Sequence, residues 1–267
     1  MDWTPVAAAL GLMVAVMSAA WAFGLAARNG GWTDVFWSFG SGAALSLVAL
    51  WPTAEADLPR QVLVAGLALA WSLRLGGYLA PRVAGHPEDA RYAQFREAFG
   101  AHYRVRMLGV ALAQAPATAV LAISVALAAQ RPGEPLGLRD LTGAAILALA
   151  VGGEALADAQ MKRFKADPGN RGKVCDTGLW AWSRHPNYVF EWLSWFAYPA
   201  IALDPARPVT WLSLSAAAVM YLLLTRVSGV PPLEEAMLRS RGAAYSAYQA
   251  RVSRFFPRAP RPEPNGA

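Results

Sequence analysis

The chain has 267 residues, of which 55% are hydrophobic, 11% aromatic and only 16% charged. Soluble domains usually contain about 25% charged residues, so this composition indicates a protein whose main solvent is the lipid bilayer. The net charge of +6 is also typical of nucleic-acid-binding proteins, but the placement of the basic residues argues against that class. A single cysteine, Cys175, excludes an internal disulfide, and we expect it to be a bystander in a reducing compartment.

Seven stretches are long and apolar enough to cross a hydrocarbon core, which takes roughly 20 helical residues. They are residues 7–27, 35–51, 61–80, 108–129, 141–161, 188–203 and 209–228. The first is too long and alanine-rich to be a removable signal peptide, and it lacks the basic start and cleavage pattern. We expect an all-α integral membrane protein with one bundle of seven transmembrane helices over residues 1–257. A disordered, proline-rich tail is expected over residues 258–267.

Basic residues are concentrated in alternate loops. If the N-terminus is external, the internal loops hold most of the lysines and arginines, while PTAEADLPR, QRPGEPLGLRD and DPARPV hold few. By the positive-inside rule, this asymmetry predicts an external N-terminus and a cytoplasmic C-terminus. It also accounts for the positive charge without a nucleic acid. The internal loops include Arg82, Arg91, Arg96, Arg104 and Arg106 after the third helix.

The start of the second helix contains Asp34 between two tryptophans, Trp32 and Trp37. Tryptophan at this depth is typical of an interfacial anchor, and Trp37 is also a candidate substrate contact. Two interpretations of Asp34 stay open. It caps the helix from its first turn, or it faces the bundle interior as an acid.

In the third helix, Trp71, Arg74 and Tyr78 lie at positions i, i+3 and i+7 and therefore share one face. One interpretation is that Arg74 extends to the headgroups near the cytoplasmic end. The other is an inward-facing Arg74 paired with an acid or a phosphate, beside the Tyr78 hydroxyl. Ionisable groups inside a membrane are costly and are therefore candidates for function. The following loop, HPEDARYAQFREAFGAHYRVR, favours a helical stretch at the cytoplasmic surface.

The segment from Glu154 to Glu191 holds most of the costly polar residues. Glu154 and Asp158, at positions i and i+4, place two carboxylates on one face of the fifth helix. Two adjacent acids repel each other unless a cation, a proton or a donor-rich ligand lies between them. Metal sites with oxygen ligands need more acids than converge here, so we expect no metal.

A basic loop follows these acids and surrounds the turn Asp167-Pro168-Gly169-Asn170. A run of charge outside a membrane is usually a headgroup contact. Here the bases flank a loop instead of covering a helix face, which favours binding of several phosphates of a soluble ligand. Neither GxGxxG nor GxxxxGK[ST] occurs. The bases are Lys162, Arg163, Lys165, Arg171 and Lys173.

The next motif is Ser183-Arg184-His185-Pro186-Asn187-Tyr188, followed by Glu191. Proline suits the first turn of a helix, so Asn187 and Glu191 share a face at i and i+4 that points into the bundle. Their donors and acceptors match a carboxamide, which has one carbonyl and one NH2. A lone histidine such as His185 is more often structural than catalytic.

Beyond the seventh helix the chain becomes polar again, starting near Arg226. Tyr245, Tyr248 and Arg251 then recur at helical spacing, and Phe255 continues the series. Two interpretations stay open for this segment: an amphipathic interfacial helix, or a lid over a bound ligand.

In this order, ExxxDxQxxxFK, GLW, SRHPNYxxE and YxxYQxR…FFP resemble the steroid 5α-reductase family of membrane oxidoreductases, especially its bacterial branch. RHPxY alone is also similar to isoprenylcysteine carboxyl methyltransferases and sterol reductases. The resemblance implies an NADPH site in a bacterial inner membrane protein, with cytoplasmic loops closing that site. Asp158 would belong to it, and Asn187 and Glu191 would hold the nicotinamide carboxamide.

The resemblance also implies that Lys165 and Lys173 occupy positions where family members place phosphate-binding arginines. The full set of expected cofactor residues is Glu154, Asp158, Lys165, Arg171, Lys173, Arg184, His185, Asn187, Tyr188, Glu191, Arg226, Tyr245, Tyr248 and Arg251. Glu154 stands where the animal enzymes have an asparagine. The family's histidine after the last membrane helix has no counterpart here.

At the substrate end the chain departs from the family. Animal enzymes use a Gln-Glu pair on the second helix and a tyrosine on the third to orient and protonate the substrate ketone. Here Asp34 lies near the position of that pair, Trp71 takes the tyrosine position, and Tyr78 is the nearest hydroxyl. We expect Tyr78, or Asp34 held protonated by an apolar setting, to be catalytic, with Trp37, Trp71 and Arg74 contacting substrate.

The sequence thus predicts an NADPH-dependent oxidoreductase acting on CH–CH donors, of the 3-oxo-5α-steroid 4-dehydrogenase type. It would reduce the C=C bond of an apolar enone, such as a 3-oxo-Δ4 steroid or a steroid-like lipid. We expect a monomer in the bilayer that binds no nucleic acid. The alternatives are an S-adenosylmethionine-dependent isoprenylcysteine-type lipid methyltransferase and an inactive homologue that binds lipid and NADPH.

Overall fold

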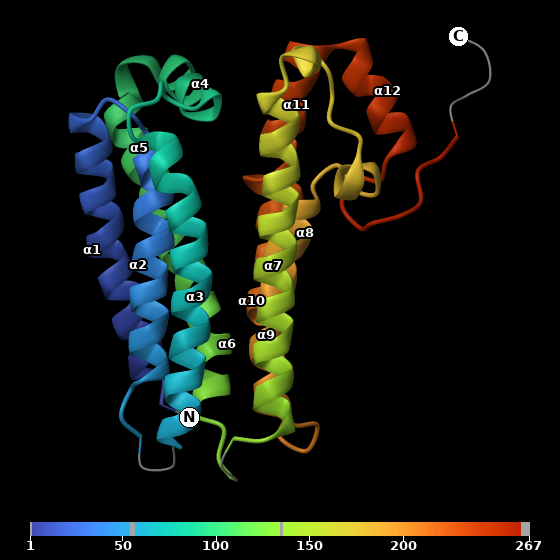
Figure 1. Cartoon of the computed structure of the whole chain (residues 1–267). Helices are drawn as coiled ribbons and strands as arrows, with labels where there is room; N and C mark the ends of the chain where they lie inside the picture. The colour runs from blue at the N-terminus through green and yellow to red at the C-terminus, as the bar shows by residue number, and fades with distance from the viewer. Residues whose placement is uncertain (1, 54–56, 134–135, 263–267) are drawn as a thin grey trace. The chain divides into compact units, whose positions relative to one another are not determined.

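The computed structural model describes residues 2–53, 57–133 and 136–262, and the regular structure in these ranges is helical (Figure 1). The chain divides into two compact units. Unit 1 comprises Met1–Ala145 and Phe196–Val219, and unit 2 comprises Ile146–Trp195 and Met220–Ala267. Helix α7 (Leu138–Ala166) begins in unit 1 and ends in unit 2.

Unit 1 consists of long helices from the first half of the chain and of short helices from the segment Phe196–Val219. Its elements besides α7 are α1 (Thr4–Ala26), α2 (Trp32–Ala49), α3 (Leu58–Val83), α4 (Ala90–Phe99), η1 (Gly100–His102), α5 (Tyr103–Leu112), α6 (Gln114–Ala129), α9 (Ala197–Ala202), η4 (Pro208–Leu214) and the start of α10 (Ser215–Leu222). The predicted helical stretch after the third helix corresponds to α4, which Asp89 caps by accepting a bond from the Arg91 amide.

Helices α1, α2 and α3 lie side by side in unit 1 (Figure 1). Small residues let α2 and α3 approach closely: a Cβ added at Gly42 would lie 2.1 Å from Ser72 Oγ. The Ser72 hydroxyl donates to the Ser38 carbonyl across the same contact at 2.8 Å. In lipid the hydrophobic effect does not hold helices together. Close packing of small residues and hydrogen bonds from hydroxyl groups do so instead.

A buried ion cluster, which the sequence did not predict, joins three segments of unit 1. Arg60 in α3 donates from Nε to Asp140 Oδ1 in α7 at 2.8 Å, and the two side chains are 0% and 1% exposed. Arg60 Nη1 donates to the Arg131 carbonyl at 2.9 Å, and Arg131 Nη2 lies 3.2 Å from Asp140 Oδ2. The cluster fixes the start of α3, the segment after α6 and the start of α7 to one another.

Among the described residues, five segments are long and apolar enough to cross a membrane: Thr4–Ala26, Leu58–Val83, Arg91–Ala129, Leu138–Ala166 and Pro208–Arg241. The protein is therefore a helical membrane protein, and these segments overlap the first, third, fourth, fifth and seventh predicted spans. The second predicted span corresponds to α2, which carries Asp34 and three serines. The sixth, residues 188–203, is broken between α8 and α9. By length and hydrophobicity, the described residues thus support five membrane spans and not the seven that were predicted.

Unit 2 is built around the second half of α7. Its other elements are η2 (Pro168–Asn170), η3 (Gly178–Ala181), α8 (Pro186–Ser194), the end of α10, the π-helix η5 (Leu223–Val227), α11 (Val230–Arg241) and α12 (Ala243–Arg251). Helix α8 begins at Pro186, as predicted. It packs closely on α7, since a Cβ at Gly153 would lie 2.3 Å from the Phe190 ring.

The C-terminal segment of unit 2 is held in place beyond α12. The amides of Arg258 and Arg261 donate to the carbonyls of Trp182 and Arg251 at 3.0 and 2.9 Å. The start of the predicted disordered tail is therefore bonded to the fold, and residues 263–267 lie outside the described residues.

Candidate functional site

The predicted site residues separate between the two units. All the predicted cofactor residues belong to unit 2, whereas Asp34, Trp37, Trp71, Arg74 and Tyr78 belong to unit 1.

Four buried or half-buried polar side chains of unit 2 come from α7 and α8. Glu154 and Asp158 on α7 and Glu191 on α8 are buried. The Asn187 amide donates to the Asp158 carboxylate at 3.3 Å, and the Trp195 indole donates to Glu191 at 3.2 Å. The contact between Asp158 and Asn187 brings together two residues that the sequence assigned to one cofactor site.

The basic loop after α7 is structured and exposed. Asp167 accepts from the Gly169 amide at 2.8 Å, and the Asn170 amide group donates to the Phe164 carbonyl at 3.1 Å. These bonds shape the turn without using the basic side chains. Lys162, Arg163, Lys165, Arg171 and Lys173 are all exposed, and so is Arg226 in η5.

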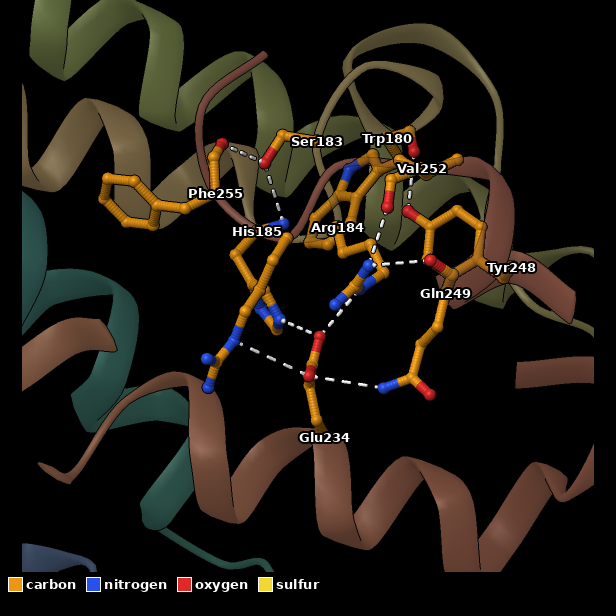
Figure 2. A network of polar contacts seen from close by, with 10 residues as sticks. Trp180, Ser183, Arg184, His185, Glu234, Tyr248, Gln249, Val252 and Phe255 are labelled. Carbon is orange, nitrogen blue, oxygen red and sulfur yellow. Dashed lines mark hydrogen bonds and ion pairs between the residues drawn. The ribbon is translucent and has the colours of Figure 1, made fainter. Parts of the chain in front are cut away.

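Glu234 in α11 is the centre of a second polar network in unit 2 (Figure 2). Its Oε1 accepts from Arg184 Nε at 2.7 Å and lies 3.2 Å from His185 Nε2. Its Oε2 accepts from Gln249 Nε2 at 3.3 Å and lies 3.8 Å from Arg254 Nε. One carboxylate thus ties the SRHPNY motif to α11, α12 and the segment that follows.

Arg184 also binds the main chain of the C-terminal segment. Its Nη1 donates to the carbonyls of Gln249 and Val252 at 3.1 and 2.6 Å, and its amide donates to the Ser253 carbonyl at 2.8 Å (Figure 2). Buried and bonded in this way, Arg184 holds the fold together. Its contact with a cofactor stays a prediction.

Two other predicted cofactor residues also have partners within unit 2. Tyr248 donates to the Trp180 carbonyl at 2.6 Å, and Arg251 Nη2 lies 2.9 Å from Asp176 Oδ2. Tyr245 and Tyr248 are buried with Val252, and burial raises the pKa of both phenols. The tyrosines of α12 thus form a small core with Val252, and both interpretations of this segment stay predictions.

His185 is 1% exposed and stacks on Tyr188, with ring centroids 5.7 Å apart. Burial lowers its pKa, and the hydrogen bond to Glu234 only partly opposes that shift. A carboxylate only accepts hydrogen bonds, so the neutral ring carries its proton on Nε2. Nδ1 is then a buried acceptor, with no hydrogen-bond partner in the described part of the chain.

Glu234 is the residue of this site that the sequence did not reveal. It stands beside Glu235, and the two acids are equivalent in the pattern VPPLEEAM. The structure separates them, because Glu235 is exposed and pairs with Arg239 one turn later. An acid pair in an otherwise basic segment was the only available signal.

In unit 1, Asp34 is not in the apolar setting that a neutral carboxyl requires. It is ion-paired with Arg91 and accepts from the Tyr92 hydroxyl at 2.8 Å. The surroundings of Asp34 are thus ionic and polar instead of the apolar setting that the prediction assumed. The pair instead connects the first turn of α2 to α4.

The other predicted residues of unit 1 form two groups. The Trp37 indole donates to Thr118 Oγ1 at 3.0 Å and meets Trp71 edge to face at 5.7 Å, so Trp37 packs inside the unit instead of anchoring it at an interface. The guanidinium groups of Arg74 and Arg82 lie 5.4 and 4.9 Å from the Tyr78 ring centroid. Arg74 therefore makes a cation–π contact with Tyr78.

Comparison with known proteins gives one family and one curated relative. Residues 20–252 match the model of the family described as "Protein of unknown function (DUF1295)". Over 103 residues, which are 36% of this chain and 27% of the relative, the sequence is 37% identical to "Uncharacterized protein C594.04c" of Schizosaccharomyces pombe. The match thus spans about a quarter of that protein's length. No solved structure matches.

Proposed function

The chain belongs to the DUF1295 family, and from the residues of unit 2 we propose that it is an NADPH-dependent membrane reductase. Its substrate would be an apolar enone, such as a 3-oxo-Δ4 steroid or a steroid-like lipid, whose C=C bond is reduced. The observation that carries the proposal is the contact between Asp158 and Asn187, with Glu154 and Glu191 buried on the same two helices.

The residues of unit 2 fit the chemical groups of NADPH. Asn187 and Glu191 offer the donor and acceptors that a nicotinamide carboxamide requires. The exposed bases at the end of α7 and in the loop after it, Lys165, Arg171 and Lys173 among them, suit phosphates, since charge-assisted bonds to phosphate are strong. When bound, NADPH supplies the hydride. Arg184, Tyr248 and Arg251 are left out of this set because the fold already uses them.

Reduction of an enone also needs a hydrogen-bond donor for the negative charge that develops on the substrate oxygen. We assign this role to Tyr78, because Asp34 is ion-paired with Arg91. The guanidinium groups of Arg74 and Arg82 lie against the Tyr78 ring and help to hold it in position. Substrate would enter from the bilayer of a bacterial inner membrane, with the basic loops on the cytoplasmic side.

Cofactor binding is the first test. Calorimetry with purified full-length protein should detect NADPH binding, and Asn187→Ala and Glu191→Ala should each weaken it about tenfold or more, as expected when a hydrogen bond to a buried ligand is lost. Glu235→Ala, which removes an exposed acid of the same unit, is the matched control and should bind like wild type. Wild-type affinity in both site variants would remove these residues from the site.

Turnover is the second test. NADPH consumption on addition of progesterone or another enone from a steroid and isoprenoid panel would support the reductase. Tyr78→Phe should lower turnover roughly a hundredfold at unchanged NADPH affinity. Binding of S-adenosylmethionine in place of NADPH would favour the methyltransferase alternative, and NADPH binding without any turnover would favour an inactive homologue.

A further inference from the structure

Unit 1 contains a pocket that has no part in the proposed reductase chemistry. Its volume is about 440 Å³, which is within the range of small-ligand sites. Four segments form most of its walls: the segment after α2, the end of α6, the start of α7 and the segment from α9 to η4. Asp2, before α1, also lines it. The other polar lining side chains include Thr53, Gln130, Arg131, Arg139, Asp204 and Arg207.

Three buried donor atoms of these lining residues are unused. Thr53 Oγ1, Gln130 Nε2 and Arg131 Nε have no hydrogen-bond partner within the described residues. Arg131 uses its Nη2 for Asp140, and its Nε is left for another group. Buried donors without partners cost free energy, and several of them lining one pocket indicate an acceptor-rich ligand.

The charges of the pocket favour an oxyanion that also carries a positive group. Arg139 and Arg207 add two cations to Arg131, whose pKa is lowered by burial and by the nearby Arg60. Asp2 and Asp204 also line the pocket. Each of these acids accepts a main-chain bond, from Thr4 and Ala206, and each is an acceptor suited to an ammonium group.

The neighbouring surface is apolar. Leu138 at the start of α7 is 81% exposed, and Trp211 in η4 is 50% exposed. Exposed leucine and tryptophan beside arginines are typical of the membrane interface, where tryptophan is enriched. A ligand with a polar headgroup and an apolar tail matches this surface better than a free ion does.

We propose that this pocket binds the headgroup of an amine-bearing phospholipid, with the phosphate on Arg131, Gln130 and Thr53 and the ammonium on the acids. Bidentate and charge-assisted bonds from arginine suit phosphate oxygens. The bound lipid would tie together the four segments that form the walls, all of which lie in unit 1.

Native mass spectrometry of the full-length protein in detergent tests this proposal. Phosphatidylethanolamine should bind at one site. Gln130→Leu combined with Arg207→Gln should lower its affinity about tenfold or more. Arg104→Gln removes an exposed arginine of the same unit outside the pocket and should bind like wild type. Thermal unfolding identifies any variant that fails to fold, and Thr53→Val then tests the pocket without changing a charge.

Two further ligands separate the possible sources of phosphate. Phosphatidylglycerol should bind more weakly than phosphatidylethanolamine, and inorganic phosphate should compete only weakly. Strong binding of inorganic phosphate without retained lipid would overturn the lipid assignment. Equal lipid binding by wild type and both pocket variants would overturn the site itself.

Discussion

Each unit has a buried carboxylate at the centre of a network, and the two networks differ in which groups they leave unused. Asp140 in unit 1 accepts from two arginines and from the Gly137 amide. Glu234 in unit 2 accepts from Arg184, Gln249 and the neutral His185. The side chains bonded to Asp140 are arginines, whereas the network of Glu234 also contains a histidine, the side chain whose usual pKa lies nearest to neutral pH.

The difference shows that a buried charge can both join distant segments and leave neighbouring polar atoms unused for a ligand. In both units the carboxylate joins segments that are far apart in the chain, which requires that every charge has a partner, because a lone buried ion costs several kcal/mol. The unused atoms then differ in character. Beside Asp140 they are donors, on Arg131 and its neighbour Gln130, and beside Glu234 the unused atom is an acceptor, His185 Nδ1. Ion clusters of similar build thus leave sites suited to opposite ligand groups.

Removing Asp140 should have the largest effect on stability. Asp140→Ala leaves Arg60 fully buried and Arg131 partly buried without their anion, and we expect a loss of about 5 kcal/mol in the free energy of unfolding. An unfolding titration in mixed micelles, followed by tryptophan fluorescence, measures this loss. Asp176→Ala, which removes the half-exposed partner of Arg251, is the control and should cost about 1 kcal/mol or less. Equal losses in the two variants would show that the cluster of unit 1 contributes no more to the free energy of unfolding than an exposed ion pair does.

Removing Glu234 should have the next largest effect. Glu234→Ala leaves Arg184 buried, but Arg184 keeps its bonds to the Gln249 and Val252 carbonyls, so we expect a loss of about 3 kcal/mol. Limited proteolysis should cut the segment after α12 faster in this variant, because the carboxylate holds that segment. Glu235→Ala should unfold and be cut like wild type. A stable Glu234→Ala with an uncut C-terminus would break the comparison, since only Asp140 would then be essential.

The sequence predicts those features of the structure that depend on residues close together in the chain, and it misses those that depend on residues far apart in the chain. Local signals located α8, since Pro186 starts it, and most of the long apolar helices. Charges with partners some 80 residues away in the chain, such as Arg60 with Asp140, have no local signal. The SRHPNY motif was recognised as a cluster, but its arginine was assigned to a cofactor because the choice of Glu234 over Glu235 depends on how α11 packs.

Acidic pH should give the smallest effect, and it separates the two networks directly. Burial lowers the pKa of His185 below the value of about 6.5 that it has when unfolded. Below that pH the unfolded chain binds a proton that the folded chain does not, so stability is complete above about pH 6.5 and falls as the pH drops, by at most about 1.4 kcal/mol per pH unit.

Unfolding titrations between about pH 5 and 8 should therefore show that the stability difference between wild type and His185→Gln shrinks on acidification. His86→Gln, at an exposed histidine of unit 1, is the matched control and should keep the wild-type profile. A difference between wild type and His185→Gln that stays constant over this range would mean that His185 takes up its proton in the folded state, and the two networks would then respond to pH alike.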